Sequence, residues 1–291
     1  MLVGALLSGL ALGSMYGLLA LGFHVTYVVS GTVNFAQGSA MMVAAVLAYG
    51  AVVGLGLPWP VAVPLVLLGG AAYGLLVEFA AVRPFARRNS SNWLIATVAL
   101  GIVVDNAVLF LFGKEPRSLP SSLAQVPITL GETPLGIYPL QAIIPGVGVL
   151  VALALSAIAR RTRVGIAMLA VVQNREAAHL MGIDPGRMIA ASFAISSALA
   201  AVAGMLIAPL VNVNADMGTL FGLKAFAAAI VGGIGSAGGV MAAGVLLGLA
   251  EAVVTTYAGS AYTQILTFAL VIVVLAARPH GLFGRADVKK V

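Results

Sequence analysis

The sequence predicts an all-α membrane protein, a polytopic transmembrane helix bundle of eight or nine spans with some segments broken or re-entrant. Two observations predict this fold class. Only 8% of the 291 residues are charged, against roughly 25% in a soluble domain, and 61% are hydrophobic. The apolar runs are about 20 residues long, which fits helical spans and not the alternating strands of about 10 residues that build barrels.

Nine apolar segments follow one another along the chain. They lie at about 2–28, 36–55, 61–82, 93–112, 138–159, 189–209, 222–235, 238–257 and 262–277. The segment 222–235 is short and ends in glycines, so we expect a broken or re-entrant helix there. We therefore expect eight or nine crossings, and we treat residues 1–291 as one transmembrane domain.

Basic residues indicate the orientation of the spans. Twelve of the 15 lysines and arginines lie in 83–92, in 160–188 and after the last span, while loops of the opposite parity hold only Lys114, Arg117 and Lys224. Basic loops stay in the cytoplasm. We therefore expect a cytoplasmic C-terminus. The net charge of +6 is loop charge of this kind, and we expect no nucleic-acid partner.

Two spans carry small residues at every fourth position. The stripes comprise Gly9, Gly13 and Gly17 in the first span and Ser192, Ser196, Ala200, Gly204 and Ala208 in the sixth. This spacing places them on one helix face, where another backbone can approach closely. The stripes therefore predict helix packing and say nothing about cargo.

The segment SGTVNFAQGS, residues 30–39, places polar residues and glycines between two apolar runs. Irregular backbone at membrane depth needs protein or water around it, and broken helices of this kind line translocation paths. Asn34 and Gln37 are therefore candidate path residues. The alternative is a tight buried turn whose amides cap helix ends.

Asp105 and Asn106 lie inside the apolar segment 93–112. A central aspartate costs about 2.5–3.5 kcal/mol to insert, and each apolar residue returns about 0.3–0.6 kcal/mol. The twelve Leu, Ile, Val and Phe residues of this span offset that cost. Both residues are candidates for the path, with a structural hydrogen bond to a neighbouring helix as the alternative for the aspartate. Glu78 and Glu251 lie nearer to span ends, where we expect them to reach the interface, so we assign them no function.

Patterns for cofactors and catalysis are weak throughout the sequence. The chain has no cysteine, and its three histidines share no metal-ligand spacing. Gly233-x-Gly235-x-x-Gly238 has the form of a dinucleotide fingerprint, but apolar spans flank it where a soluble strand and helix are needed. The sequence contains no GxxxxGK[ST] pattern. We therefore expect no cofactor, no metal and no enzymatic activity, and ATP would have to bind another subunit.

The basic segment 160–188 contains a further local pattern. The stretch VQNREAAHLMGIDPGR, from Val172 to Arg187, mixes polar and apolar residues and predicts a short amphipathic helix that ends at Gly182. Asp184 and Pro185 suit the start of the next helix. Such a helix either docks on a soluble partner or lies on the lipid surface.

These pieces resemble one family, the permeases of branched-chain amino acid (Liv-type) ABC importers. EAAHLMG (176–182) is similar to the Glu-Ala-Ala-x-x-x-Gly core of the loop that contacts the ATPase in ABC importers. Four longer stretches resemble the Liv-type permeases in order and spacing: YGLLALGFHVTYVVSGTVNFAQG (16–38), RTRVGIAMLAVVQNREAAHLMGID (161–184), GLKAFAAAIVGGIGSAGGVMAAGVLLGLAE (222–251) and RPHGLFG (278–284). The chain has NFAQGS where the family often has Asn-Phe-Ala-His-Gly-Glu, and it lacks the Ile-x-Leu-Pro of the wider loop pattern.

The resemblance implies a complex in a bacterial inner membrane. Two homologous permeases would pair in the lipid bilayer, two cytoplasmic ABC ATPases would drive them, and a periplasmic binding protein would deliver the amino acid to the 113–137 loop. Segment 160–188 would be the coupling loop. The residues implied to contact the ATPase are Arg175, Glu176, Ala177, Ala178 and Gly182.

Alternatives for the cargo and the transport class stay open from the sequence. Related permeases carry urea, short amides or other amino acids. A stand-alone secondary transporter or channel is the rival of a different class, and it would transport without a partner ATPase. The docking pattern at 176–182 and the scarcity of charge inside the spans argue against that rival.

Overall fold

The computed structural model describes residues 2–86, 92–125, 127–130, 133–278 and 280–284. Residues 87–91 of the predicted internal loop and the basic tail from 285 lie outside them. The helices are α1 (Leu2–Ser30), α2 (Gln37–Tyr49), α3 (Trp59–Val77), α4 (Arg83–Ala86), α5 (Trp93–Phe112), α6 (Ser122–Gln125), α7 (Pro139–Arg161), α8 (Arg163–Gln173), α9 (Arg175–Leu180), α10 (Pro185–Ile207), α11 (Met217–Gly232), α12 (Ala237–Tyr257) and α13 (Thr263–Ala277). Short π-helical or 3₁₀ pieces are η1 (Gly50–Gly54), η2 (Glu78–Val82) and η3 (Ser260–Tyr262), and the strands are β1 (Ile128–Leu130) and β2 (Thr133–Ile137).

The predicted membrane bundle is confirmed. Within the described residues, eight helices are long and apolar enough to cross a membrane. The span predicted at 93–112 coincides with α5 at both ends. The short segment predicted near 222–235 is α11, which has 16 residues and starts earlier, at Met217.

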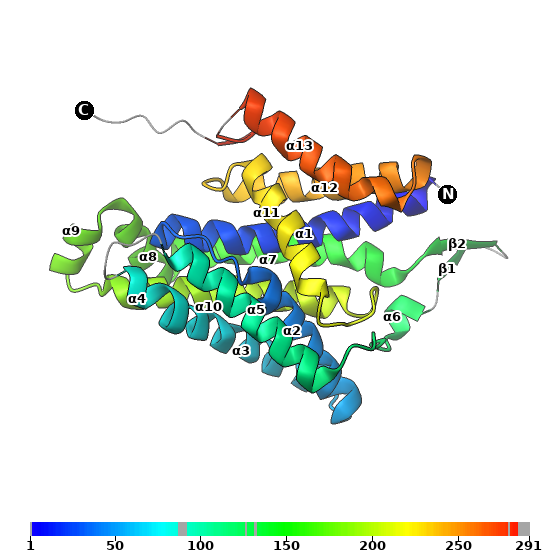
Figure 1. The fold of residues 1–291 in the computed structure, drawn as a ribbon, viewed down its shortest axis with the longest axis horizontal. Helices are drawn as coiled ribbons and strands as arrows, with labels where there is room; N and C mark the ends of the chain where they lie inside the picture. The colour runs from blue at the N-terminus through cyan, green and yellow to red at the C-terminus, as the bar shows by residue number, and fades with distance from the viewer. Residues whose placement is uncertain (1, 87–91, 126, 131–132, 279, 285–291) are drawn as a thin grey trace.

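Helix α1 occupies the centre of the bundle (Figure 1). It packs against α7, α10, α11 and α12, and it is the most buried of the eight long helices. Helices α5, α7 and α13 are the least buried, with 11%, 11% and 6% of their most apolar stretch covered. Helix α9 and the β1–β2 hairpin lie at opposite ends of the long axis (Figure 1).

Small residues set the closest helix crossings. A Cβ atom on Gly13 would lie 2.8 Å from the carbonyl oxygen of Gly244, and a Cβ on Gly9 would lie 2.7 Å from that of Gly248. A Cβ on Gly17 would lie 2.6 Å from the sulfur of Met241. The α1 stripe therefore faces α12, and any larger side chain there would push the two helices apart.

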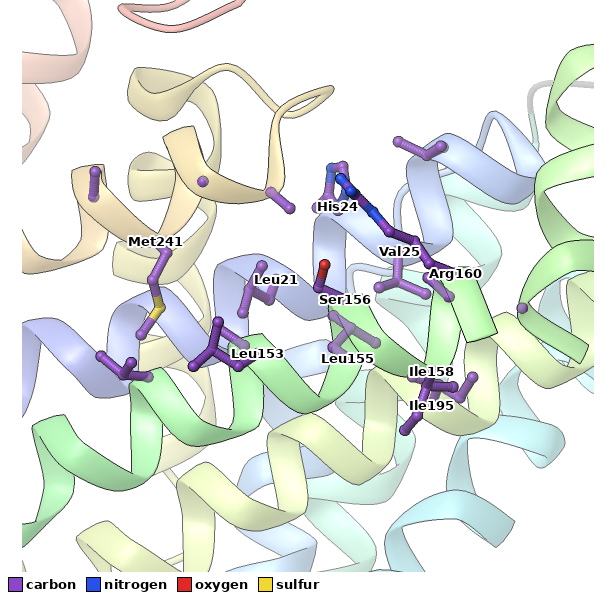
Figure 2. Close-up of a pocket in the computed structure, with 18 of the residues that line it drawn as sticks. Leu21, His24, Val25, Leu153, Leu155, Ser156, Ile158, Arg160, Ile195 and Met241 are labelled. Carbon is purple, nitrogen blue, oxygen red and sulfur yellow. The ribbon is translucent and has the colours of Figure 1, made fainter. Parts of the chain in front are cut away.

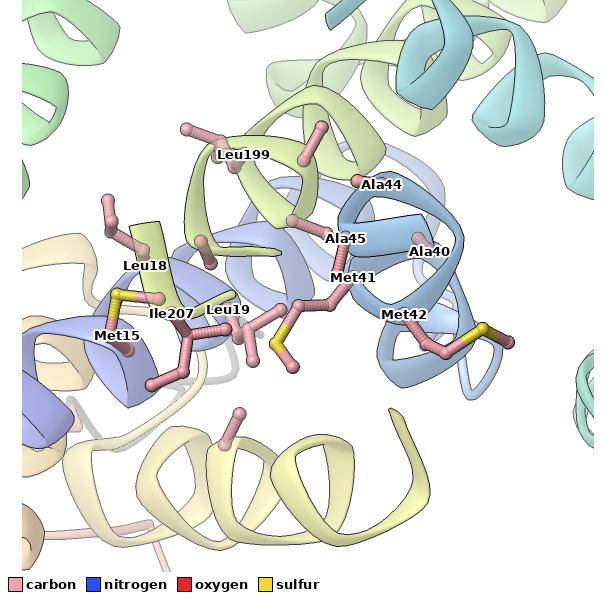
Figure 3. Close-up of a cluster of buried hydrophobic side chains, with 14 of the residues drawn as sticks. Met15, Leu18, Leu19, Ala40, Met41, Met42, Ala44, Ala45, Leu199 and Ile207 are labelled. Carbon is pink, nitrogen blue, oxygen red and sulfur yellow. The ribbon is translucent and has the colours of Figure 1, made fainter. Parts of the chain in front are cut away.

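The apolar core surrounds the same central helix. Figure 3 shows side chains of α1, α2 and α10 meeting in one cluster, among them Met15, Leu18, Leu19, Met41, Ala44, Ala45, Leu199 and Ile207. Gly204 of α10 lies against the carbonyl oxygen of Met41, and Ala200 is completely buried. The small-residue stripe of α10 thus lets α2 approach the centre of the bundle.

Segment 113–137 contains two short strands, β1 and β2. Strands β1 and β2 pair antiparallel, and Thr129 is opposite Pro134. Proline is tolerated there because a two-stranded ribbon has two edges, and its missing N–H can point away from the partner strand.

Candidate functional site

The chain between α1 and α2 returns into the bundle without helical structure. Residues 31–36 are non-helical, and Asn34 and Gln37 are both 0% exposed. The Nε2 of Gln37 donates to the carbonyl oxygen of Ser196 at 2.9 Å, and the Nδ2 of Asn34 donates to the Oε1 of Gln37 at 3.3 Å. The Asn34 Oδ1 accepts a hydrogen bond from the backbone N–H of Ala36 at 3.1 Å. Both amides are thus satisfied inside protein, as buried polar groups generally are.

Ser196 joins three helices at this turn. Its hydroxyl lies 2.9 Å from the carbonyl oxygen of Gly22 on α1 and 2.9 Å from the Oε1 of Gln37. Ser196 is at the middle of α10, so α2 begins at mid-depth and not at the membrane surface. In this conformation Asn34 and Gln37 have the geometry of a buried turn, and a part in the path stays a prediction for both.

The N-terminal ends of α2 and α11 meet beside this turn. A Cβ on Gly218 would lie 2.6 Å from the carbonyl oxygen of Gly38, and a Cβ on Gly222 would lie 2.9 Å from the Gly38 Cα. Each helix begins there, α2 at Gln37 and α11 at Met217. Helix N-termini carry partial positive charge. Two discontinuous helices therefore direct their positive ends to one place inside the bundle.

Asp105 of α5 lies at this meeting point. Its half-buried carboxyl group faces the hydroxyls of Ser39 and Thr219, which belong to the first turns of α2 and α11. The Oδ1 atom is buried and has no hydrogen-bond partner among the described residues. Asp105 is seven residues from Phe112, the last residue of α5, which is about 10 Å along the helix axis. The carboxyl group is therefore well inside the membrane.

Asn106 points away from the bundle. It is exposed, and its Nδ2 donates to the carbonyl oxygen of Ile102 in its own helix at 2.8 Å. Asp216 and Thr219 at the start of α11 are exposed as well. We call Asp105, Asn106, Asp216 and Thr219 the polar face. It offers two carboxylates, a hydroxyl and an amide, which can bind the two polar ends of a small zwitterion through ion pairs and hydrogen bonds.

A buried ion pair is a feature that sequence reasoning missed. The Nζ of Lys224 on α11 lies 2.9 Å from the Oε2 of Glu251 on α12. Tyr16 of α1 donates its hydroxyl to the same oxygen at 2.9 Å, and Thr267 of α13 donates to the Oε1 at 2.7 Å. We call these four residues the ionic cluster. It holds α11 to three other helices.

Two predictions are wrong at the ionic cluster. Lys224 was counted as a loop residue, yet it lies in the middle of α11, and Glu251 was expected to reach the interface, yet it is 4% exposed. Glu78, also expected near the interface, is 5% exposed. The signal was present, because a lysine and a glutamate within apolar spans must pair with something. Only the packing of the spans shows which residues are partners.

Segment 160–188 contains two short helices, α8 and α9. Asn174 ends α8 and caps α9, where its side-chain oxygen accepts from the backbone N–H of Ala177 at 2.9 Å. The predicted short helix is therefore α9, which begins at Arg175 and not at Val172. Gly182 follows α9 with φ +83°, a conformation that glycine adopts easily. Asp184 caps α10 through the N–H of Gly186 at 2.8 Å, as predicted.

The predicted contact residues differ in exposure. Arg175, Glu176, Ala177 and Gly182 are exposed, whereas Ala178 is 5% exposed and packs inward. Leu180 and Met181 at the tip of α9 are 86% and 83% exposed. Figure 1 shows α9 projecting at the end of the bundle opposite the hairpin. An apolar tip on a projecting helix suits a protein partner or a lipid surface.

Two further candidate chemistries have no support in the described residues. No group of three or more histidine, cysteine, aspartate or glutamate side chains there could hold a metal ion. The glycine pattern that begins at Gly233 lies in the turn between α11 and α12, where Ser236 caps α12. It is a helix–turn–helix connection and not a strand followed by a helix, so it is no dinucleotide fingerprint.

Long apolar helices, two helices that begin inside the bundle and a polar face at their meeting point are the architecture of a membrane permease. The chain belongs to the family described as "Branched-chain amino acid transport system / permease component", whose profile matches residues 5–275. The resemblance found in the sequence is thereby confirmed.

Individual relatives match nearly the whole chain. The "High-affinity branched-chain amino acid transport system permease protein BraD" of Pseudomonas aeruginosa is 35% identical over 98% of this chain and 97% of its own length. LivH of Escherichia coli K12, with the same description, is 36% identical over 98% of this chain and 96% of its own length. A probable LivH of Methanocaldococcus jannaschii is 29% identical over 94% of this chain and 89% of its own length.

Proposed function

We propose that this chain is the membrane-spanning permease subunit of an ATP-driven ABC importer for branched-chain amino acids. The relatives named for that transport support the cargo, because they match almost end to end. The observation that carries the mechanism is the pairing of a polar face inside the membrane with a projecting helix at one end of the bundle. The polar face offers a path for the substrate, and the projecting helix α9 offers a contact through which an ATPase can move the bundle.

The polar face is our candidate for the path wall. Moving an unpaired amide or hydroxyl out of water costs about 1–3 kcal/mol in proteins, and an ionised carboxylate costs more. Asn106, Asp216 and Thr219 are exposed, so a chain alone in lipid would incur that cost. A water-filled seam along the polar face would remove this cost, because the polar groups would stay in contact with water. The first turns of α2 and α11 would then face substrate carboxylate, and Asp105 would face the ammonium group.

A second permease subunit is the partner that would enclose such a seam. Helix α5 carries two residues of the polar face and is only 11% buried, and α13 is only 6% buried. Apolar residues such as Ile102, Val103 and Phe110 surround Asn106 on the exposed side of α5. Pairing of two α5 helices would cover the apolar residues and leave the polar ones on a shared axis. One gene product or two can fill the two positions.

Segment 160–188, which we call the coupling segment, would contact two cytoplasmic ATPase subunits. Leu180 and Met181 give α9 an apolar tip, and Arg175 and Glu176 give it a charged side. A short helix of this kind fits a groove on a soluble protein. The sequence has no phosphate-binding loop of its own, so ATP hydrolysis would take place in that partner. Movement of α9 would reach the path through α8, α10 and α1, which pack against one another.

The positive-inside rule supports the orientation that this mechanism needs. With segment 160–188 in the cytoplasm, the β1–β2 hairpin lies outside and the C-terminus inside the cell membrane. The hairpin end would then receive the amino acid from an external binding protein. Specificity would rest mainly with that protein, and the polar face would need only to bind the two charged groups common to all amino acids.

Uptake by the reconstituted complex tests this function. We expect the tagged chain to co-purify with ATPase subunits and to import labelled leucine, but not urea or an amide, only when ATP is present inside. Reversing both charges in Arg175→Glu/Glu176→Arg should abolish uptake. The control is Arg83→Glu, which reverses the charge of one exposed arginine on α4, outside segment 160–188. Transport by the chain alone under an ion gradient would contradict the proposal.

A further inference from the structure

A large groove follows α1 on the side away from the polar face. Its volume is about 970 Å³, and it is lined by α1, α7, α8 and α12, with Ile195 of α10 at its edge (Figure 2). It is open to the outside of the bundle, and Leu153 and Leu246 on its walls are 66% and 52% exposed. The groove is therefore a feature of the lipid-facing surface and not an enclosed cavity.

The lining is apolar along most of its length. It contains no aspartate or glutamate, and one of its two serines, Ser14, donates to the carbonyl oxygen of Leu10 within its own helix at 2.8 Å. On α7 the lining extends from Pro145 to Arg160, which is about 22 Å of helix. One leaflet contributes a hydrocarbon layer of about 15 Å. A groove of this length can hold a lipid chain of one leaflet together with its polar end.

The charged residue of the lining lies at one end. Figure 2 shows Arg160 and His24 at the same end of the groove, with Met241 farther along it. The Nδ1 atom of His24 is hydrogen-bonded to the carbonyl oxygen of Ile234 at 2.7 Å. Arg160 is exposed and forms no ion pair with any residue that the structure describes. A guanidinium group is thus free to bind an anion where the apolar groove ends.

We propose that the groove binds an anionic phospholipid, with its acyl chains along α1 and its phosphate on Arg160. The match of charge supports this occupant, since a cation at the membrane surface attracts anionic headgroups and nothing in the lining repels them. Shape supports it too, because the walls of an apolar groove lose packing contacts unless acyl chains fill it. The lipid belongs to the leaflet at the Arg160 end. Calling that leaflet cytoplasmic rests on the proposed orientation.

A bound lipid would connect the central helix to the coupling segment. Gly165, Met168 and Leu169 of α8 line the same groove, beside the end that carries Arg160. Acyl chains packed against α1, α7 and α8 would hold these helices at a fixed spacing. The lipid therefore acts as a structural ligand at the place where movement of the coupling segment enters the bundle.

Retention of lipid by the purified chain tests whether the charge of Arg160 binds the lipid headgroup. The full-length chain is placed in nanodiscs of equal phosphatidylglycerol and phosphatidylcholine, released, and analysed by native mass spectrometry. We expect retained phosphatidylglycerol, reduced about fivefold by Arg160→Gln, because one basic residue near the surface contributes about 1 kcal/mol. Arg161→Gln is the matched control, an exposed neighbour outside the lining, and should change retention less than twofold. Equal losses in both variants, or equal retention of both lipids, would overturn the proposal.

Photo-crosslinking tests the groove itself. The chain has no cysteine, so Ser156→Cys introduces a single attachment point in the lining. A photoreactive maleimide at this position should form an adduct with radiolabelled phosphatidylglycerol. An adduct with another protein instead would identify a protein occupant and contradict the lipid assignment. Because both readouts measure bound lipid, their failure would leave the transport proposal untouched.

Discussion

Removing one partner of the ionic cluster should destabilise the bundle more than removing both. At 2.9 Å, Lys224 and Glu251 attract each other by about 6 kcal/mol if the effective dielectric constant is about 20. Desolvation cancels much of that energy while the pair is intact. A single neutralisation leaves the other charge inside the membrane, which costs about 3–5 kcal/mol. The Lys224 side chain is 19% exposed, so we expect the lower end, about 3 kcal/mol.

Heating experiments measure this cost. We expect Lys224→Met and Glu251→Gln each to lower the midpoint temperature by about 6 °C, taking about 2 °C per kcal/mol for a chain of this size. The measurement is the fraction of monodisperse protein that remains on gel filtration after heating. The double variant should lie within about 1 kcal/mol of the parent, because neither charge is then unpaired.

A tyrosine variant separates the hydrogen bond from the charge pair. Tyr16→Phe removes one donor to the Glu251 carboxylate and should cost about 1.5–3 kcal/mol. Tyr27→Phe is the matched control on the same helix, because Tyr27 is 41% exposed. We expect its effect to stay within about 0.5 kcal/mol. The reasoning would be refuted if the double variant Lys224→Met/Glu251→Gln lost as much stability as the two single variants together. Additive losses would show that the two residues have no coupling energy.

Three further predictions concern the crossings, the coupling helix and the path. Gly248→Leu should prevent isolation of monodisperse protein, because a Cβ there meets the backbone of Gly13, whereas Gly146→Ala has open space and should be neutral on gel filtration. Asn174→Ala should cost α9 about 1 kcal/mol and lower ATPase co-purification, while Asn174→Asp keeps the cap and should behave like the parent. Asn106→Leu should lower leucine uptake at least several-fold without changing the amount of folded complex; full uptake would remove Asn106 from the path.

The spans were predictable because their signal is local. Trp93 and Phe112 bound an unbroken apolar run, and Gly113 follows with φ +88°, so both ends of α5 could be predicted from residues next to one another. The start of α10 was predictable for the same reason, since Asp184 and Pro185 are a cap and a first helical residue. Periodicity and capping are properties of a short window of sequence.

The site was predictable only in part because its contacts are distant in sequence. Asp105 drew attention as an acid within a span, but Ser39 and Thr219, which it faces, come from α2 and α11. Lys224 was mistaken for a loop residue because counting basic residues gives no information about partners. Glu251, its partner, lies on the next helix and could be assigned only after the helices were packed.

Accessibility of residue 106 in the assembled importer tests the account most directly. The parent chain has no cysteine, so Asn106→Cys carries the only reactive thiol of the permease. We predict that a water-soluble thiol reagent modifies it in the complex and that bound leucine slows the reaction. No modification by that reagent, together with rapid modification by a lipid-soluble one, would place residue 106 against lipid and contradict a path along the polar face.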